Sequence, residues 1–159
     1  MKKLFLSLMC LLTVLIFNAN SCQAEKVLIY QEHKNGKYTG VDCYAYTESI
    51  KKDYFVVRKD GQRYRSKKRA CVSIKTDQIV SATGENKYAS TWYYFYKNVN
   101  GKWFNVHSSN SEAYWLDVSL GFSVDDGTYV EKILDVVKNN FDCDSLPNTE
   151  ANANGGFGL

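Results

Sequence analysis

Hydrophobic and polar residues alternate along much of the chain after residue 25, and three glycine-containing turns divide the alternation. The turn sequences are KNGK at 34–37, KDGQ at 59–62 and VNGK at 99–102. Asn-Gly and Asp-Gly accept the positive φ angles of tight hairpin turns, and a period of two is typical of half-buried strands. The pattern therefore predicts three β-hairpins. Their strand pairs are expected at 27–33 with 38–46, at 54–58 with 62–65, and at 91–97 with 102–107.

Further β-rich runs lie between and after the hairpins. The segments ACVSIKT (70–76) and QIVSAT (78–83) predict two short strands. The segment YWLDVSLGFSV (114–124) predicts another, which bends at Gly121. The only proline, Pro147, lies outside every expected strand, so no strand has to accommodate a residue without a backbone N–H.

One segment has helical periodicity. Its apolar stripe consists of Val130, Ile133, Leu134, Val137 and Phe141, at three- and four-residue spacing. Thr128 and Glu131 form a Thr-x-x-Glu capping box, which is typical of a helix start. We expect a helix at about 128–140, with Ile133, Leu134 and Val137 buried against the sheet.

These elements predict an α+β domain that is mostly β. We expect an antiparallel β-meander, as a sandwich or a small barrel, with one C-terminal α-helix. Residues 22–145 are enough for a single domain with its own core. Residues 146–159 are rich in asparagine and glycine and contain little to bury, so a disordered tail is expected there.

The N-terminus has the composition of a secretory signal peptide at 1–21. Lys2 and Lys3 precede a 14-residue apolar run, which is shorter than the roughly 20 residues of a membrane-spanning helix. Cleavage directly before Cys22 and cleavage after Ala24 are both compatible with the small residues there. A third alternative is lipidation of Cys22, as in bacterial lipoproteins. We therefore expect export to the bacterial periplasm, to the outer membrane if the chain is lipidated, or to the medium.

Charge argues against a nucleic-acid partner. The formal net charge of +3 falls to +1 when Lys2 and Lys3 leave with the signal peptide, so the mature domain lacks a strong positive field. A membrane contact is expected only through a lipid anchor on Cys22.

The cysteines of the mature chain predict a disulfide. Exported chains meet oxidising surroundings, which favour disulfide formation. We expect at least one bond among Cys43, Cys71 and Cys143, with Cys143 favoured as a partner because it would tie the end of the helix to the sheet. The pairing stays open. No CxxC motif or Cys/His cluster in the sequence indicates a redox or metal site.

The stretch WYYFY at 92–96 places five aromatic residues in succession. Alternate residues of a strand point to opposite faces, so both faces of this strand are aromatic. Two structures are compatible with that pattern: the strand is covered on both faces, or one aromatic face is exposed and binds a partner. The candidate contact residues are Trp92, Tyr94, Tyr96 and Trp103.

A basic hairpin at 58–69 (RKDGQRYRSKKR) carries seven basic residues and one acid. Such residues often protect a sheet edge or remain solvated. Alternatively they form a positive patch for an acidic partner, and a third option is contact with the acidic segment 112–150 of the same chain. The candidates are Arg63, Arg65, Lys67, Lys68 and Arg69.

No catalytic constellation is apparent in the sequence. His107 precedes Ser108 and Ser109, but neither a nucleophile elbow nor the glycine pattern of an oxyanion hole accompanies it. Phosphate-binding, dinucleotide-binding and zinc motifs are missing from the sequence, and no cofactor or metal is expected.

The sequence thus favours an exported, non-catalytic binding domain that acts by contact with another protein, as inhibitors and immunity proteins do. One alternative is a small lipocalin-like barrel with an apolar ligand inside, although the N-terminal Gly-x-Trp of lipocalins is missing. Another is an envelope hydrolase that uses His107. A ligand barrel needs an apolar cavity, a contact domain needs a filled core and an exposed patch, and a hydrolase needs His107 near a nucleophile and a cleft.

Overall fold

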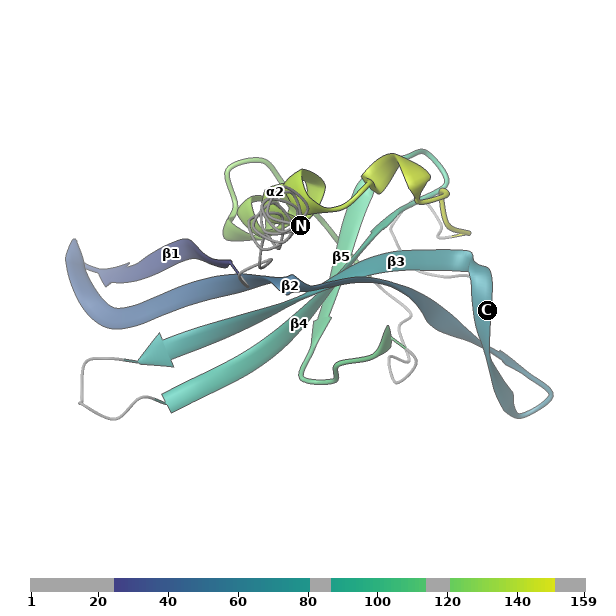
Figure 1. Ribbon diagram of the computed structural model, residues 1–159, viewed down its shortest axis with the longest axis horizontal. Helices are drawn as coiled ribbons and strands as arrows, with labels where there is room; N and C mark the ends of the chain where they lie inside the picture. Colours follow the sequence, from purple (N-terminus) through teal and green to yellow (C-terminus); the bar gives the residue numbers. More distant parts are fainter. Residues whose placement is uncertain (1–24, 81–86, 114–120, 151–159) are drawn as a thin grey trace, which may run out of the picture.

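The computed structural model describes residues 25–80, 87–113 and 121–150 of the 159-residue chain. Its main element is an antiparallel sheet of six strands in sequential order, curled into a half-barrel (Figure 1). The strands are β1 (Lys26–Lys34), β2 (Lys37–Lys59), β3 (Gln62–Val80), β4 (Lys87–Lys97), β5 (Trp103–Ser108) and β6 (Phe122–Ser123). In the described part of the chain, one α-helix, α2 (Tyr129–Asn140), and a 3₁₀ turn, η2 (Cys143–Ser145), follow the strands. The predicted α+β meander with a C-terminal helix is confirmed.

The first two hairpins turn where the sequence predicts. Asn35 and Gly36 have φ angles of 53° and 74°, and Asp60 and Gly61 have φ angles of 52° and 74°. Two successive positive φ angles match the right-handed twist of the flanking strands. The third turn has a different construction, because the side chain of Asn98 accepts hydrogen bonds from the backbone N–H groups of residues 100 and 102.

Strands β2 and β3 are each longer than expected. The segments 38–46 and 54–58 belong to one strand, and so do 62–65 and 70–76. Tyr46 pairs with Lys75 and Lys51 pairs with Ser73, so four residues of β2 bulge out opposite a single residue of β3. Bulges bend a strand and increase its twist, which contributes to the curl of the sheet.

The last predicted strand is described only in part. Residues 114–120 lie outside the described residues, and the remainder of that segment forms β6, which pairs with β5. Cys22 and the predicted signal peptide also lie outside the described residues. Within the described ranges, no helix is long and apolar enough to cross a membrane.

Helix α2 begins and packs as predicted. The Thr128 side chain accepts a hydrogen bond from the Glu131 backbone N–H at 3.2 Å, and the Glu131 carboxylate accepts one from Gly127 N–H at 2.6 Å. The helix lies over one face of the sheet and contacts β1 and β2 (Figure 1). The predicted inner residues Ile133 and Leu134 are buried, as is Val137.

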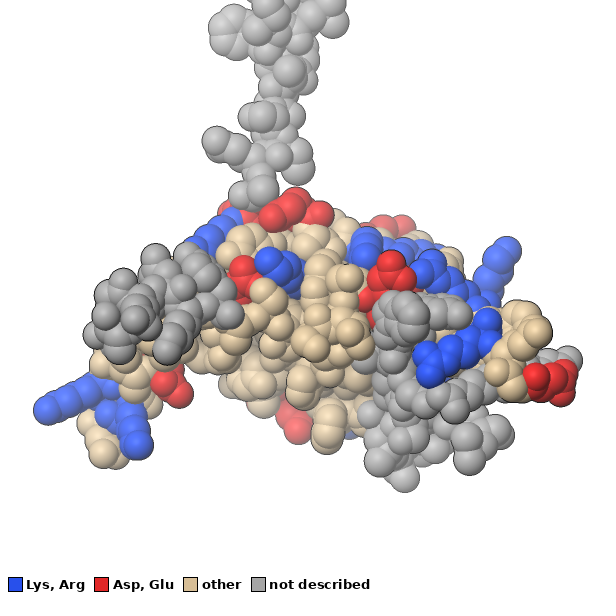
Figure 2. All heavy atoms as spheres, turned by 90° about the horizontal axis from the view of Figure 1, so that it is seen from below, with Lys and Arg blue, Asp and Glu red and all other residues tan. Residues whose placement is uncertain are grey.

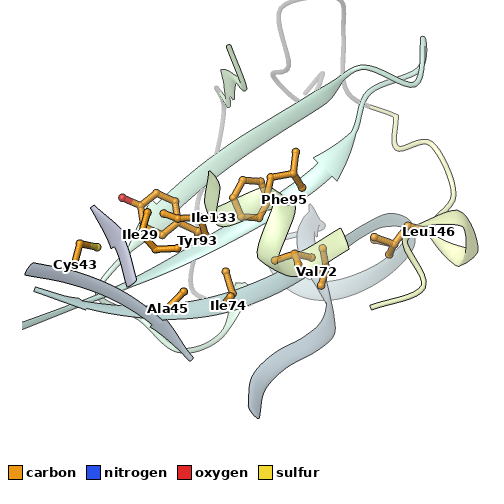
Figure 3. Close-up of a cluster of buried hydrophobic side chains, with 12 residues drawn as sticks. Ile29, Cys43, Ala45, Val72, Ile74, Tyr93, Phe95, Ile133 and Leu146 are labelled. Atoms are coloured by element: carbon orange, nitrogen blue, oxygen red, sulfur yellow. The ribbon is translucent and has the colours of Figure 1, made fainter. Parts of the chain in front are cut away.

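The first core lies between the helix and the sheet, where side chains from four strands point towards those of the helix (Figure 3). It contains Ile29, Cys43, Ala45, Ala70, Val72, Ile74, Tyr93, Phe95, Ile133, Leu134, Val137 and Leu146. A second core lies on the opposite face of the sheet. It contains Phe55, Cys71, Tyr94, Tyr96, Phe104, Val106 and Ala113. Strand β4 therefore contributes large aromatic side chains to both cores.

The segment after η2 is described up to Glu150 and contacts the sheet, and the rest of the predicted tail lies outside the described residues. Leu146 is buried in the first core. The backbone N–H of Thr149 donates to the Lys97 carbonyl at 2.8 Å, and Lys68 forms an ion pair with Glu150 at 3.1 Å. The sequence of this segment contains few apolar residues, but its backbone hydrogen bonds attach it to the end of the sheet.

Candidate binding surface and cleft

A group of aromatic rings lies on the sheet face opposite α2, and a lysine ammonium lies over each ring. We name this group the lysine–aromatic face. It comprises Lys26 over Tyr44 (3.7 Å from Nζ to the ring centroid), Lys75 over Tyr46 (5.1 Å) and Lys51 over Trp92 (5.3 Å). The register explains the grouping, because Tyr46 pairs with Lys75 and Lys75 with Trp92 across three adjacent strands. Figure 2 views the molecule from below, where the centre of the surface is largely uncharged and lysine and arginine gather towards its ends.

A hydrogen-bond network centred on Asp77 holds part of this face in place. The Asp77 carboxylate is buried, and it accepts hydrogen bonds from the Ser90 hydroxyl at 2.7 Å and from the Lys75 ammonium at 3.2 Å. Burial alone would raise the pKa of Asp77, but the hydrogen bonds from Ser90, Lys75 and Tyr46 outweigh it and lower that pKa. The charge of Lys75 is therefore balanced within the protein.

The same sheet face becomes a core further along the strands. Tyr94 and Tyr96 are 0 % exposed, and burial raises the pKa of both phenols. The Tyr94 hydroxyl donates to the backbone carbonyl of Asn110, and Tyr96 meets Phe55 edge-to-face. The prediction that Tyr94 and Tyr96 could belong to an exposed aromatic face is wrong, because the second core covers them.

The other two aromatic candidates lie on opposite sides of the sheet. Trp92 is half-buried and packs against the rim of the second core. Trp103 packs against the first core instead, with the Lys97 ammonium 5.3 Å from its ring centroid. The structure therefore does not bring Trp92 and Trp103 together in one surface.

The basic hairpin contacts the acidic C-terminal segment at two points. Arg65 pairs with Glu112 at 3.3 Å, and Lys68 pairs with Glu150 at 3.1 Å. The Arg69 guanidinium donates to the backbone carbonyl of Val56 and is half-buried. Lys67 is exposed and Arg63 is half-buried. Part of the predicted positive patch is thus engaged by acids of the same chain.

His107 lies beside a cleft of about 380 Å³ between β5, β6 and the start of α2. Its ring lies near Tyr93, with centroids 5.6 Å apart, and near Phe122, with centroids 6.3 Å apart. Ser123 also lines the cleft, and its hydroxyl donates a hydrogen bond to the Asp125 carboxylate at 2.8 Å. Among the described residues, no hydrogen bond joins His107 to a serine or threonine hydroxyl.

The three described cysteines are free thiols. Cys43 belongs to the first core and Cys71 to the second, so the sheet separates them. Burial raises the pKa of Cys43 to about 11 and that of Cys71 well above the usual range. Cys143 is half-buried at the edge of the first core. A disulfide in the exported protein stays a prediction.

Sequence reasoning missed most of the lysine–aromatic face. Tyr44 and Tyr46 alternate with the small residues Cys43 and Ala45, and that alternation is a signal that one face of the strand is aromatic. It missed Asn105, Phe122 and Tyr129 at the cleft for a different reason. These residues are far apart along the chain, and only the fold brings them together.

Comparisons of the chain with protein-family models, with curated proteins and with solved structures gave no match.

Proposed function

We propose that this protein is an exported, non-catalytic binding domain that acts by contact with another protein, as inhibitors and immunity proteins do. The observation that carries the proposal is the lysine–aromatic face. Tyrosine and tryptophan are enriched among the residues that dominate binding energy at protein interfaces. Their rings bury a large area when covered and lose little side-chain entropy. Export rests on the composition of the N-terminal segment.

Prior organisation of the face supports a binding role. The Asp77 carboxylate holds Ser90 and Lys75, and Lys75 in turn lies over Tyr46. Side chains that are already fixed lose less entropy when a partner covers them. The rings of the face are half-buried and held in this way before any partner binds, which favours a role in recognition.

The charges of the face indicate the chemistry of the partner. Lys26 and Lys51 are exposed, whereas Asp77 balances the charge of Lys75. A partner surface with carboxylates around an apolar centre would complement these ammonium groups and the rings beneath them. We therefore expect an acidic contact surface on the partner protein.

Side chains fill the space on both sides of β4. This favours a domain that binds a partner at its surface over a barrel that holds a ligand inside. Aromatic side chains occupy both sides of this strand, with Phe95 in the first core and Tyr94 and Tyr96 in the second. A barrel for an apolar ligand would need open volume lined by such residues. The cleft beside His107 lies at the junction of β5, β6 and α2, and polar groups contribute to its lining.

The proposal is tested by affinity capture. The purified protein is immobilised and exposed to envelope extract, and retained proteins are identified by mass spectrometry. We expect a protein that wild type retains, that Trp92→Ala and Lys51→Glu lose, and that moderate salt weakens. The matched controls are Tyr64→Ala, which removes an exposed ring of the basic hairpin, and Lys67→Glu, which reverses an exposed charge there.

The outcome of the controls decides between two surfaces. If Lys67→Glu abolishes retention and Lys51→Glu does not, the partner binds the basic hairpin and the lysine–aromatic face is the wrong site. If all four variants retain the same proteins as wild type, the proposed mode of contact is wrong.

A further inference from the structure

The cleft beside His107 combines flat rings with unused hydrogen-bonding groups. Phe122 is 64 % exposed and Tyr129 is 45 % exposed, and both line the cleft with His107. The His107 and Phe122 rings are inclined by only 29°. These residues give the cleft apolar, nearly flat walls of the size of a small ring.

The side-chain amide of Asn105 lines the cleft and makes one hydrogen bond in the described part of the chain. Asn105 is 3 % exposed, and its side-chain nitrogen donates to the Phe122 carbonyl at 3.2 Å. This bond fixes the orientation of the amide. Its side-chain oxygen has no hydrogen-bond partner in the described part of the chain, although the residue lines the cleft. An acceptor in such a position favours a ligand that brings a hydroxyl or N–H donor.

Donors and a second acceptor lie around the same space. The Asp125 carboxylate accepts from Ser123 through one oxygen, and its other oxygen has no partner among the described residues. Tyr129 and Val130 are the first two residues of α2. Their backbone N–H groups have no carbonyl partner inside the helix, so they can donate to a ligand. The residues that line the cleft thus include both hydrogen-bond acceptors and hydrogen-bond donors.

These groups select among ligand classes. An apolar ligand would cover the Asn105 and Asp125 oxygens without offering them a hydrogen-bond donor, which costs free energy. An anion would meet the carboxylate of Asp125, and a cation would meet the positive end of the helix dipole. A neutral ring with hydroxyl groups at its edge and C–H groups on its faces satisfies both the polar groups and the flat rings.

We infer that this cleft binds a neutral saccharide through its ring face and its hydroxyl groups. Its volume of about 380 Å³ lies at the lower end of the range for small-molecule sites, which suits one or two sugar units. This site lies apart from the lysine–aromatic face, so the inference is independent of the proposed protein contact.

Ligand-observed NMR tests the inference. The purified full-length protein is mixed with glucose, galactose, mannose, N-acetylglucosamine, maltose and cellobiose, and saturation transfer is recorded for each. N-acetylneuraminic acid and benzyl alcohol are the anionic and apolar probes. We expect transfer to at least one neutral saccharide, with a dissociation constant on the order of millimolar.

Variants locate the site. Phe122→Ala and Tyr129→Ala should each weaken binding by roughly tenfold, since each removes one stacking ring. Tyr64→Ala removes a ring of similar exposure elsewhere, and Trp92→Ala alters the lysine–aromatic face; both should leave saccharide binding unchanged. Circular dichroism confirms that each variant is folded. Three results would overturn the inference: no neutral saccharide binds at about 20 mM, only the anionic or apolar probe binds, or Phe122→Ala and Tyr129→Ala both bind as wild type does.

Discussion

Tyr96 and Gly121 meet so closely that residue 121 has no room for a side chain. A Cβ atom at Gly121 would overlap the Tyr96 hydroxyl and lie 2.8 Å from its Cζ atom. Tyr96 is fully buried in the second core, so its ring has little freedom to move away. The glycine therefore allows the chain beside β6 to approach the core.

Gly121→Ala is expected to destabilise the protein by roughly 1–3 kcal/mol, the usual cost of overpacking a core. Tyr96→Phe removes the oxygen atom that overlaps, so Gly121→Ala should cost less in that background. Urea denaturation of the four proteins in this double-mutant cycle gives the coupling. An equal cost of Gly121→Ala in both backgrounds would show that the two residues are not in contact.

Leu134→Ala is expected to cost roughly 2–5 kcal/mol of unfolding free energy, because it leaves a cavity between α2 and the sheet. Lys132→Ala, on the exposed side of the same helix, should change stability by less than about 0.5 kcal/mol. Thermal and urea unfolding of both variants measure the difference. Similar values for the two variants would mean that the buried face of the helix is assigned incorrectly.

Truncation of a buried side chain on either face of β4 should lower the unfolding free energy by a similar amount. Phe95→Ala opens the first core and Tyr94→Ala opens the second, and each is expected to cost roughly 3–5 kcal/mol. Trp92→Ala should cost less, because Trp92 is only half-buried at the rim. Unfolding free energies of the three variants test this order. If Tyr94→Ala were as stable as wild type, the second core would not form as described.

Asp77 should make the folded protein less stable as the pH falls into the acid range. Its pKa is lower in the folded protein than in the unfolded chain, so its contribution is present above the unfolded value, which is near 3.9. The contribution is lost as pH falls through the folded value. Asp77→Asn should therefore lose less stability than wild type between neutral and acid pH. If Asp77→Asn and wild type lost the same stability on acidification, the network around Asp77 would be unimportant.

Local features of the sequence were sufficient for most of the fold. Asn35-Gly36 and Asp60-Gly61 each encode a turn within two residues, and Thr128 with Glu131 encodes the helix start within four. The continuity of β2 was missed because its bulge after Tyr46 interrupts the alternation. That interruption resembles the end of a strand when only the sequence is considered.

The site could be predicted only in part, since burial on the second face depends on the curl of the sheet. Tyr94, Tyr96 and Trp92 share one face, as their alternation requires, yet two are core residues and one is at the rim. Phe55 covers the buried pair from a distant part of β2. No local pattern around residues 92–96 contains that information.

The most direct test of the central proposal is the dissociation constant of the captured partner for wild type and for Trp92→Ala. In the lysine–aromatic face Lys51 lies over Trp92, and loss of an interface tryptophan often costs about 2 kcal/mol or more. We expect affinity to fall by roughly 30-fold or more, while unfolding free energy changes far less than for Phe95→Ala. An unchanged dissociation constant in a folded Trp92→Ala variant would contradict a partner site on the lysine–aromatic face.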